Sequence, residues 1–196
     1  ERGAPPAPLA VLGPGSGLGV AALLPGEPYP RPLISEGGHV TMPATDRLEA
    51  DLFALLWEDF GHVSAERLLS GPGLSNIHSG LARLQGAPAE VLDPAAVTQR
   101  GLESGDSLCR QSLELFCLLL GTFAGNVALS YGARGGVYLG GGILPRFPDF
   151  LAGSGFRARF EDKGRFRSYL EDIPTWLITR PNAAFLGLAA SAEQFA

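Results

Sequence analysis

The first apolar positions of the chain form two short runs separated by a turn. Residues 9–12 are apolar, residues 13–19 hold four glycines, and residues 20–24 are apolar again. Two strand-like runs joined by a glycine-rich turn predict a β-hairpin. Leu33 and Ile34 are expected to begin a further strand, which leads into the polar string Glu36-Gly37-Gly38-His39.

The middle of the chain carries apolar residues at helical spacing. Asp46 and Glu49 have the spacing of a capping box, and an apolar stripe follows them until Gly61. A second stripe predicts another helix, and Asp93-Pro94 is typical of an N-cap followed by a first-turn proline. The two stripes consist of Leu48, Leu52, Leu55 and Leu56, and of Leu74, Ile77, Leu81 and Leu84.

The second half of the chain contains the longest predicted helix, at residues 106–131. Residues 136–139 predict a buried strand, residues 173–179 predict a last strand, and Asn182 can cap a closing helix. Together these elements predict an α/β fold with a mixed β-sheet. One face of the long helix carries small residues that let another backbone approach closely, namely Gly121, Ala124, Gly125 and Ala128.

The composition is that of a globular domain with its own core. Of the 196 residues, 45% are hydrophobic and 18% are charged. The net charge is −5 and the basic residues are scattered, which argues against nucleic-acid binding. The longest apolar runs, such as residues 118–120, are far shorter than the roughly 18 residues of a membrane span. We therefore expect neither a nucleic acid nor a membrane as partner.

The two cysteines of the chain indicate the cellular compartment in which it is found. Cys109 and Cys117 stand eight positions apart in the predicted long helix, too far apart for a disulfide. They indicate reduced, buried thiols in a cytoplasmic protein, and no zinc site.

The chain begins at Glu1, and residues 1–8 resemble the remnant of a linker, so we expect a further segment before it. Residues 9–181 are interpreted as one domain.

The glycine-rich turn is the first candidate for chemistry. Gly13, Gly15 and Gly17 lack side chains that would keep a ligand from the backbone. With Ser16 they can present consecutive N–H groups to an anion. A Walker A loop needs a Lys and a Rossmann loop opens a helix, and neither applies here. The turn resembles the phosphate clip of the actin-like sugar kinases; the alternative is a plain tight hairpin.

Glu36, His39 and Glu66 form the second candidate constellation. Carboxylates accept hydrogen bonds from sugar hydroxyls, each worth roughly 1.5–3 kcal/mol, and a neutral histidine both donates and accepts. The alternative makes Glu36 a turn residue, His39 a satisfied core histidine and Glu66 a carboxylate in the first turn of a short helix capped by Ser64. Taken alone, these residues favour the structural alternative.

The third candidate is the run Gly140-Gly141-Gly142 after a predicted buried strand. Glycines there can let an adenine ring lie against the backbone. Because glycine-rich strand ends are common in α/β proteins, this run alone has low specificity.

Longer strings around these residues resemble the bacterial glucokinase family. They are residues 36–39 (EGGH), 62–73 (HVSAERLLSGPG), 140–147 (GGGILPRF) and 154–166 (SGFRARFEDKGRF). The resemblance runs in order from about residue 9 to residue 188. It implies the large domain of an actin-like ATPase, a ribonuclease H-like fold with helices flanking a mixed sheet. It also implies phosphorylation of glucose to glucose 6-phosphate by ATP with Mg²⁺.

The resemblance also assigns the candidate residues. It implies that Glu36, His39 and Glu66 bind the sugar. It places phosphate at Gly13, Gly15, Ser16 and Gly17, and adenosine at Gly140, Gly141 and Gly142. The cysteine-rich zinc motif of related sugar kinases does not occur in the sequence, which favours the zinc-free branch and no metal ligands in this chain.

Two motifs of the resembled family do not occur in residues 1–196: its first phosphate loop, Asp-x-Gly-Gly-Thr-Asn, and an Asn-Asp pair whose Asp is the general base. We therefore predict no catalytic residue in this chain, little or no kinase activity for it alone, and an active full-length parent with an additional amino-terminal small domain. The alternative is a non-catalytic sugar-binding or regulatory module.

The last segment, residues 182–196, would return toward that small domain in the resembled family. Its apolar residues are therefore expected to be exposed, and they could support a homodimer. They are Phe185, Leu186, Leu188 and Phe195.

Overall fold

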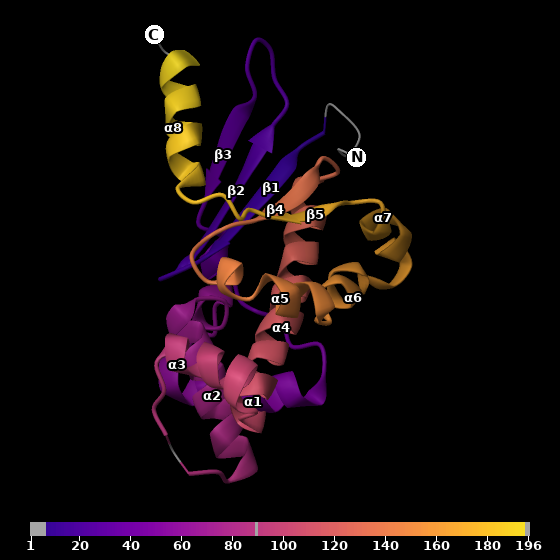
Figure 1. The fold of residues 1–196 in the computed structure, drawn as a ribbon. Coiled ribbons are helices and arrows are strands. Elements are labelled where there is room, and N and C mark those ends of the chain that lie inside the picture. The colour runs from indigo at the N-terminus through magenta and orange to yellow at the C-terminus, as the bar shows by residue number, and fades with distance from the viewer. Residues whose placement is uncertain (1–6, 89, 195–196) are drawn as a thin grey trace.

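A five-stranded mixed sheet is the central layer of the fold in the computed structural model, which describes residues 7–88 and 90–194 (Figure 1). The strand order is β3-β2-β1-β4-β5, with β2 antiparallel to both of its neighbours and β1, β4 and β5 mutually parallel. The predicted hairpin, third strand and mixed sheet are thus confirmed. The strands are β1 (Leu9–Pro14), β2 (Leu18–Leu24), β3 (Arg31–Ser35), β4 (Gly136–Leu139) and β5 (Thr175–Leu177), the last shorter than predicted.

Helices extend the molecule beyond the sheet. In Figure 1, α1, α2 and α3 gather below the sheet, and α4 runs from among them along the sheet. The predicted N-caps Asp46 and Asp93 are confirmed, since each accepts a backbone hydrogen bond at a helix start, and Asp106 also caps α4. The helices are α1 (Arg47–Phe60), α2 (Gly71–Gln85), α3 (Pro94–Gln99), α4 (Ser107–Tyr131), α5 (Pro148–Gly153), α6 (Phe156–Glu161), α7 (Arg167–Glu171) and α8 (Ala183–Gln194).

Helix α4 forms the core of the molecule. It is long and apolar enough to span a membrane, but 78% of its most apolar window is buried, as in the central helix of a globular domain. Its predicted small face is confirmed, because a Cβ added at Gly125 would lie 2.5 Å from the carbonyl oxygen of Phe160 in α6. Cys109 and Cys117 are free and buried, and burial raises their thiol pKa to about 11 and about 12. Such thiols are protonated and unreactive near neutral pH.

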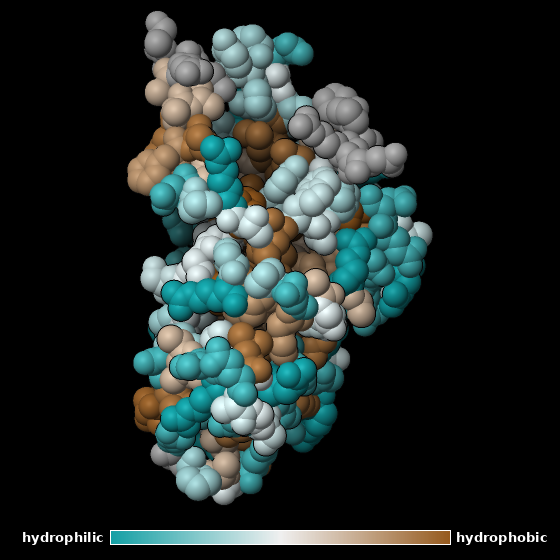
Figure 2. All heavy atoms as spheres, viewed as in Figure 1, coloured by the Kyte–Doolittle hydropathy of each residue, from teal (hydrophilic) through white to brown (hydrophobic). Residues whose placement is uncertain are grey.

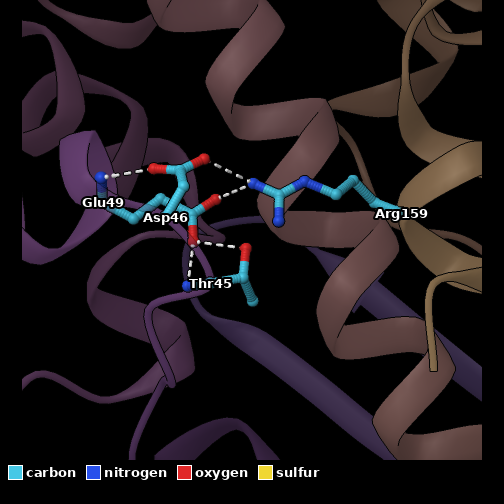
Figure 3. Close-up of polar contacts among 4 residues, drawn as sticks. All are labelled: Thr45, Asp46, Glu49 and Arg159. Atoms are coloured by element: carbon cyan, nitrogen blue, oxygen red, sulfur yellow. Dashed lines mark hydrogen bonds and ion pairs between the residues drawn. The ribbon is translucent and has the colours of Figure 1, made fainter. Parts of the chain in front are cut away.

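A buried ion cluster ties α1 to α6 (Figure 3). Glu49, in the first turn of α1, is fully buried, and its carboxylate pairs with the guanidinium of Arg159. Its other oxygen accepts hydrogen bonds from Thr45 N and Oγ1 at 2.6 and 2.9 Å. Arg159 also contacts Asp46, the N-cap of α1, at 3.0 Å. The cluster fixes the start of α1, into which the segment after His39 leads.

The closing helix α8 exposes its apolar side chains. Phe185, Leu186 and Leu188 are 69%, 48% and 64% exposed, as predicted, and Phe195 lies outside the described residues. Brown, apolar atoms gather at the upper left of Figure 2, where Figure 1 places α8. The predicted linker at residues 1–8 lies almost wholly outside the described residues.

Removing the arginine of the buried cluster should destabilise the fold. Arg159→Ala leaves the fully buried Glu49 carboxylate without its cation, so we expect the free energy of unfolding to fall by about 3–5 kcal/mol. Urea unfolding followed by circular dichroism measures this. Arg83→Ala, which breaks exposed pairs with Glu58 and Asp59, is the control and should cost less than about 1 kcal/mol. Equal losses in the two variants would contradict the assignment.

The stability should depend on pH through His78. This side chain is 3% exposed in α2, and burial, partly opposed by Asp106 and Glu90, lowers its pKa. Since the folded state binds the proton less readily than the unfolded state, stability is full above about pH 6.5 and falls as the pH drops below it. His78→Leu should reduce the loss of unfolding free energy between pH 7.5 and 5. An equal loss in His78→Leu and in the wild type would contradict the assignment to His78.

Candidate functional site

Two hydrogen bonds to residues outside the hairpin hold the β1–β2 turn, residues 15–17, in place. Leu18 N donates to Glu66 Oε2 at 2.8 Å, and Gly71 N donates to Gly15 O at 2.8 Å. Within the turn, Gly15 N donates to Gly17 O at 2.8 Å. The segment that carries Glu66 therefore fixes the position of the turn.

Two N–H groups of this turn remain for a ligand. Among the described residues, the backbone N–H groups of Ser16 and Gly17 donate to no protein acceptor. A Cβ at Gly17 would lie 2.5 Å from Glu66 Oε2, so a side chain there would push this carboxylate away from its position against the turn. Adjacent free N–H groups in a tight turn form a concave site for a phosphate oxygen.

The three predicted sugar-binding residues meet beside this turn. The imidazole of His39 lies 4.0 Å from Glu66 through Nδ1 and 3.8 Å from Glu36 through Nε2. The side chain of His39 is 61% exposed, so the alternative of a satisfied core histidine is wrong. The side chains of Glu36 and Glu66 are 88% and 33% exposed. All three polar groups are thus open to a ligand.

Their meeting depends on a short antiparallel ribbon. Residues 40–42, which follow His39, pair with residues 63–65, which precede Glu66. Met42 N donates to Val63 O at 3.0 Å, and Ala65 N donates to Val40 O at 2.9 Å. Ser64 caps the 3₁₀ turn Ala65–Arg67, as predicted. The ribbon brings two polar strings together that are far apart in the sequence.

A cleft of about 410 Å³ opens on the other side of the turn. We call it the turn cleft. Its walls come from the turn, from the start of α2, from the start of α3 and from the segment after the glycine run. The lining residues include Gly15, Ser16, Gly71, Pro72, Asp93, Pro94, Ala95, Gly142, Ile143 and Arg146.

The predicted nucleotide residues are divided between two clefts, except Gly17, which is not among the lining residues of either. Gly15, Ser16 and Gly142 line the turn cleft. Gly13 pairs with Gly19 at the end of the hairpin strands, outside the turn itself. It lines a second cleft of about 810 Å³ beside α8, together with Gly140, Gly141 and Gly142. Gly142 belongs to both clefts, so they adjoin.

Sequence reasoning missed two charged residues of the turn cleft. Asp93 was recognised only as an N-cap, a role that the structure confirms, and Arg146 only as part of a family string. No local pattern marks them, because they reach the cleft from segments that are more than 50 positions apart.

Comparisons with known proteins show what this chain is similar to. A family model described as glucokinase matches residues 1–195. The glucokinase of Chromobacterium violaceum is 53% identical over 95% of this chain, which spans 53% of the length of that relative. The chain thus covers about half of a full-length protein of this kind.

Solved structures of other proteins have the same fold as this chain. The chain matches the crystal structure of a glucokinase from an Antarctic psychrotroph with a TM-score of 0.93 and 36% identity, over 99% of this chain and 60% of that one. A glucokinase from Balamuthia mandrillaris, solved with glucose, matches with a TM-score of 0.76 over 91% of this chain and 51% of that one. Its identity is 21%, so this likeness concerns the fold alone. The chain has the actin-like sugar-kinase fold.

Proposed function

The chain belongs to the glucokinase family, and we propose that its full-length protein transfers the γ-phosphoryl group of ATP to the 6-hydroxyl of glucose. One observation supports the proposal for this site: Glu66 belongs to the candidate sugar-binding cluster, where it lies beside His39, and it also contacts the candidate phosphate-binding turn. A sugar hydroxyl and a phosphate held at these two places would be close neighbours. Such positioning is the main requirement of phosphoryl transfer.

The sugar would be bound by three side chains with complementary roles. Glu36 and Glu66 would accept hydrogen bonds from hydroxyls, and His39 would both donate and accept. Because Glu66 Oε2 is engaged with Leu18 N, its Oε1, which faces His39, is the atom for the sugar. The Glu66 side chain would thus be held in place before the sugar arrives.

The nucleotide would lie along the turn cleft, with its phosphates at the N–H groups of Ser16 and Gly17 and its adenosine toward Gly142. The adjoining glycines Gly140 and Gly141 would form the backbone behind it. Mg²⁺ is usually bound through substrate phosphates. It would arrive with ATP and neutralise phosphate charge, since the N–H groups of the turn suit phosphate oxygens and not a cation.

The remaining parts of the proposal concern what lies outside this chain. We propose that an amino-terminal small domain supplies the general base and a second phosphate loop. The protein is proposed to act in the cytoplasm without zinc, and α8 offers an apolar surface for that domain or for a second subunit. A sugar sensor without catalysis would need neither a base nor the turn cleft.

The chain alone should be nearly inactive, and the full-length protein active. Base assistance contributes roughly 10²–10⁴-fold to rates, so we expect turnover of the 196-residue chain to be at least about 100-fold lower. Coupling the formation of glucose 6-phosphate to NADPH production measures both proteins. Comparable turnover would contradict the assignment of the base, and an inactive full-length protein would contradict the kinase itself.

Substitutions of Glu66 should separate its two contacts. In the full-length protein, Glu66→Gln keeps an oxygen for Leu18 N but loses the charge, so the KM for glucose should rise about tenfold or more, with little change in the KM for ATP. Glu66→Ala also releases the turn and should raise both KM values. Steady-state kinetics with either substrate varied measures this.

Glu58→Gln, an exposed carboxylate remote from the site, is the matched control and should leave both KM values unchanged. Unaltered glucose kinetics in Glu66→Gln would show that this carboxylate does not bind the sugar.

A further inference from the structure

The turn cleft contains two formal charges. Among its ten lining residues in the described chain, Asp93 and Arg146 are charged, and the others are small, apolar or, for Ser16, neutral polar. In a cleft of this kind, a few polar groups orient the ligand. Arg146 suits an anionic ligand, whereas the carboxylate of Asp93, which also caps α3, would repel a phosphate group.

Asp93 and the candidate phosphate-binding turn line the same cleft, and Gly71 lies close to both segments. Gly71 N donates to Gly15 O, and a Cβ added at Gly71 would lie 3.5 Å from both Gly15 O and Pro94 Cγ. Gly71 is therefore next to both the turn and Pro94, the residue after Asp93. In a nucleotide bound with its phosphates at the turn, the ribose is the next group along the molecule.

The Asp93 carboxylate is held in place with one oxygen available. Oδ1 accepts a hydrogen bond from Ala96 N at 2.8 Å, which caps α3. Within the part of the chain that the structure describes, Oδ2 has no hydrogen-bond or ion-pair partner. An ionised carboxylate only accepts hydrogen bonds and repels phosphate. The ligand group at Oδ2 must therefore be a donor, and the donors on a ribose are its hydroxyls.

We propose that Asp93 binds the ribose hydroxyls of the nucleotide and makes the site select ribonucleotides over their deoxy analogues. This inference rests on the proposed use of ATP and adds to it a residue that discriminates between nucleotides. The neighbouring wall of Pro72, Pro94 and Ala95 offers no competing acceptor side chain. A deoxy analogue would leave Oδ2 without its hydrogen bond, which lowers its binding.

The test compares nucleotide preference in the full-length protein. The kcat/KM is measured at saturating glucose for ATP, 2′-deoxy-ATP and 3′-deoxy-ATP, in the wild type and in Asp93→Ser. Serine caps a helix as well as aspartate does but lacks the second oxygen, so α3 keeps its start. The wild type should prefer ATP over at least one analogue by about tenfold. Asp93→Ser should lose that preference while keeping its activity with the analogue.

Asp106→Ser is the matched control, because Asp106 caps α4 in the same way outside the cleft. It should retain the wild-type preference. A wild type without preference, or the same preference in Asp93→Ser, would overturn this inference alone. If the full-length wild type does not phosphorylate glucose with ATP, the proposed function falls and this inference with it.

Discussion

The hydrogen bond from Leu18 N to Glu66 Oε2 is the contact on which the site depends. It joins the hairpin turn to the segment that follows the ribbon, two parts of the chain that are 48 positions apart. It sets the separation between the free N–H groups of the turn and the open oxygen of Glu66, and the bond from Gly71 N to Gly15 O supports it. Gly17 is part of the same constraint, because a side chain there would displace the carboxylate.

A second constraint acts from farther away. The segment that carries Glu36 and His39 runs into α1, and the start of α1 is fixed by the ion cluster of Glu49, Asp46 and Arg159. Through Arg159, this cluster anchors α1 to α6, which packs on the small face of α4. The exposed polar loop follows β3 directly, and the ribbon and then α1 hold the segment after it. The fully buried carboxylate of Glu49 therefore helps to position the candidate site from a distance.

Much of this arrangement could be predicted from local sequence patterns. The hairpin, the caps of α1 and α3 and the small face of α4 follow from spacing over a few residues. The family strings identified Glu36, His39 and Glu66, which the structure brings together. Contacts between distant segments could not be predicted. Glu49 looked like a capping-box residue, whereas its carboxylate pairs with Arg159, 110 positions away, and accepts from Thr45. Gly13 looked like part of the turn, but it pairs with Gly19 in the strands.

The apolar surface of α8 has a consequence for anyone who handles this chain in isolation. Phe185 and Leu188 keep most of their surface in water, and hydrophobic association strengthens with warming and with salts such as sulfate. Solutions of the isolated chain should therefore change their scattering with concentration, temperature and salt type even while the core around α4 stays folded. Detergent or a low-salt buffer would be the first remedy for a cloudy sample, before any change to the sequence.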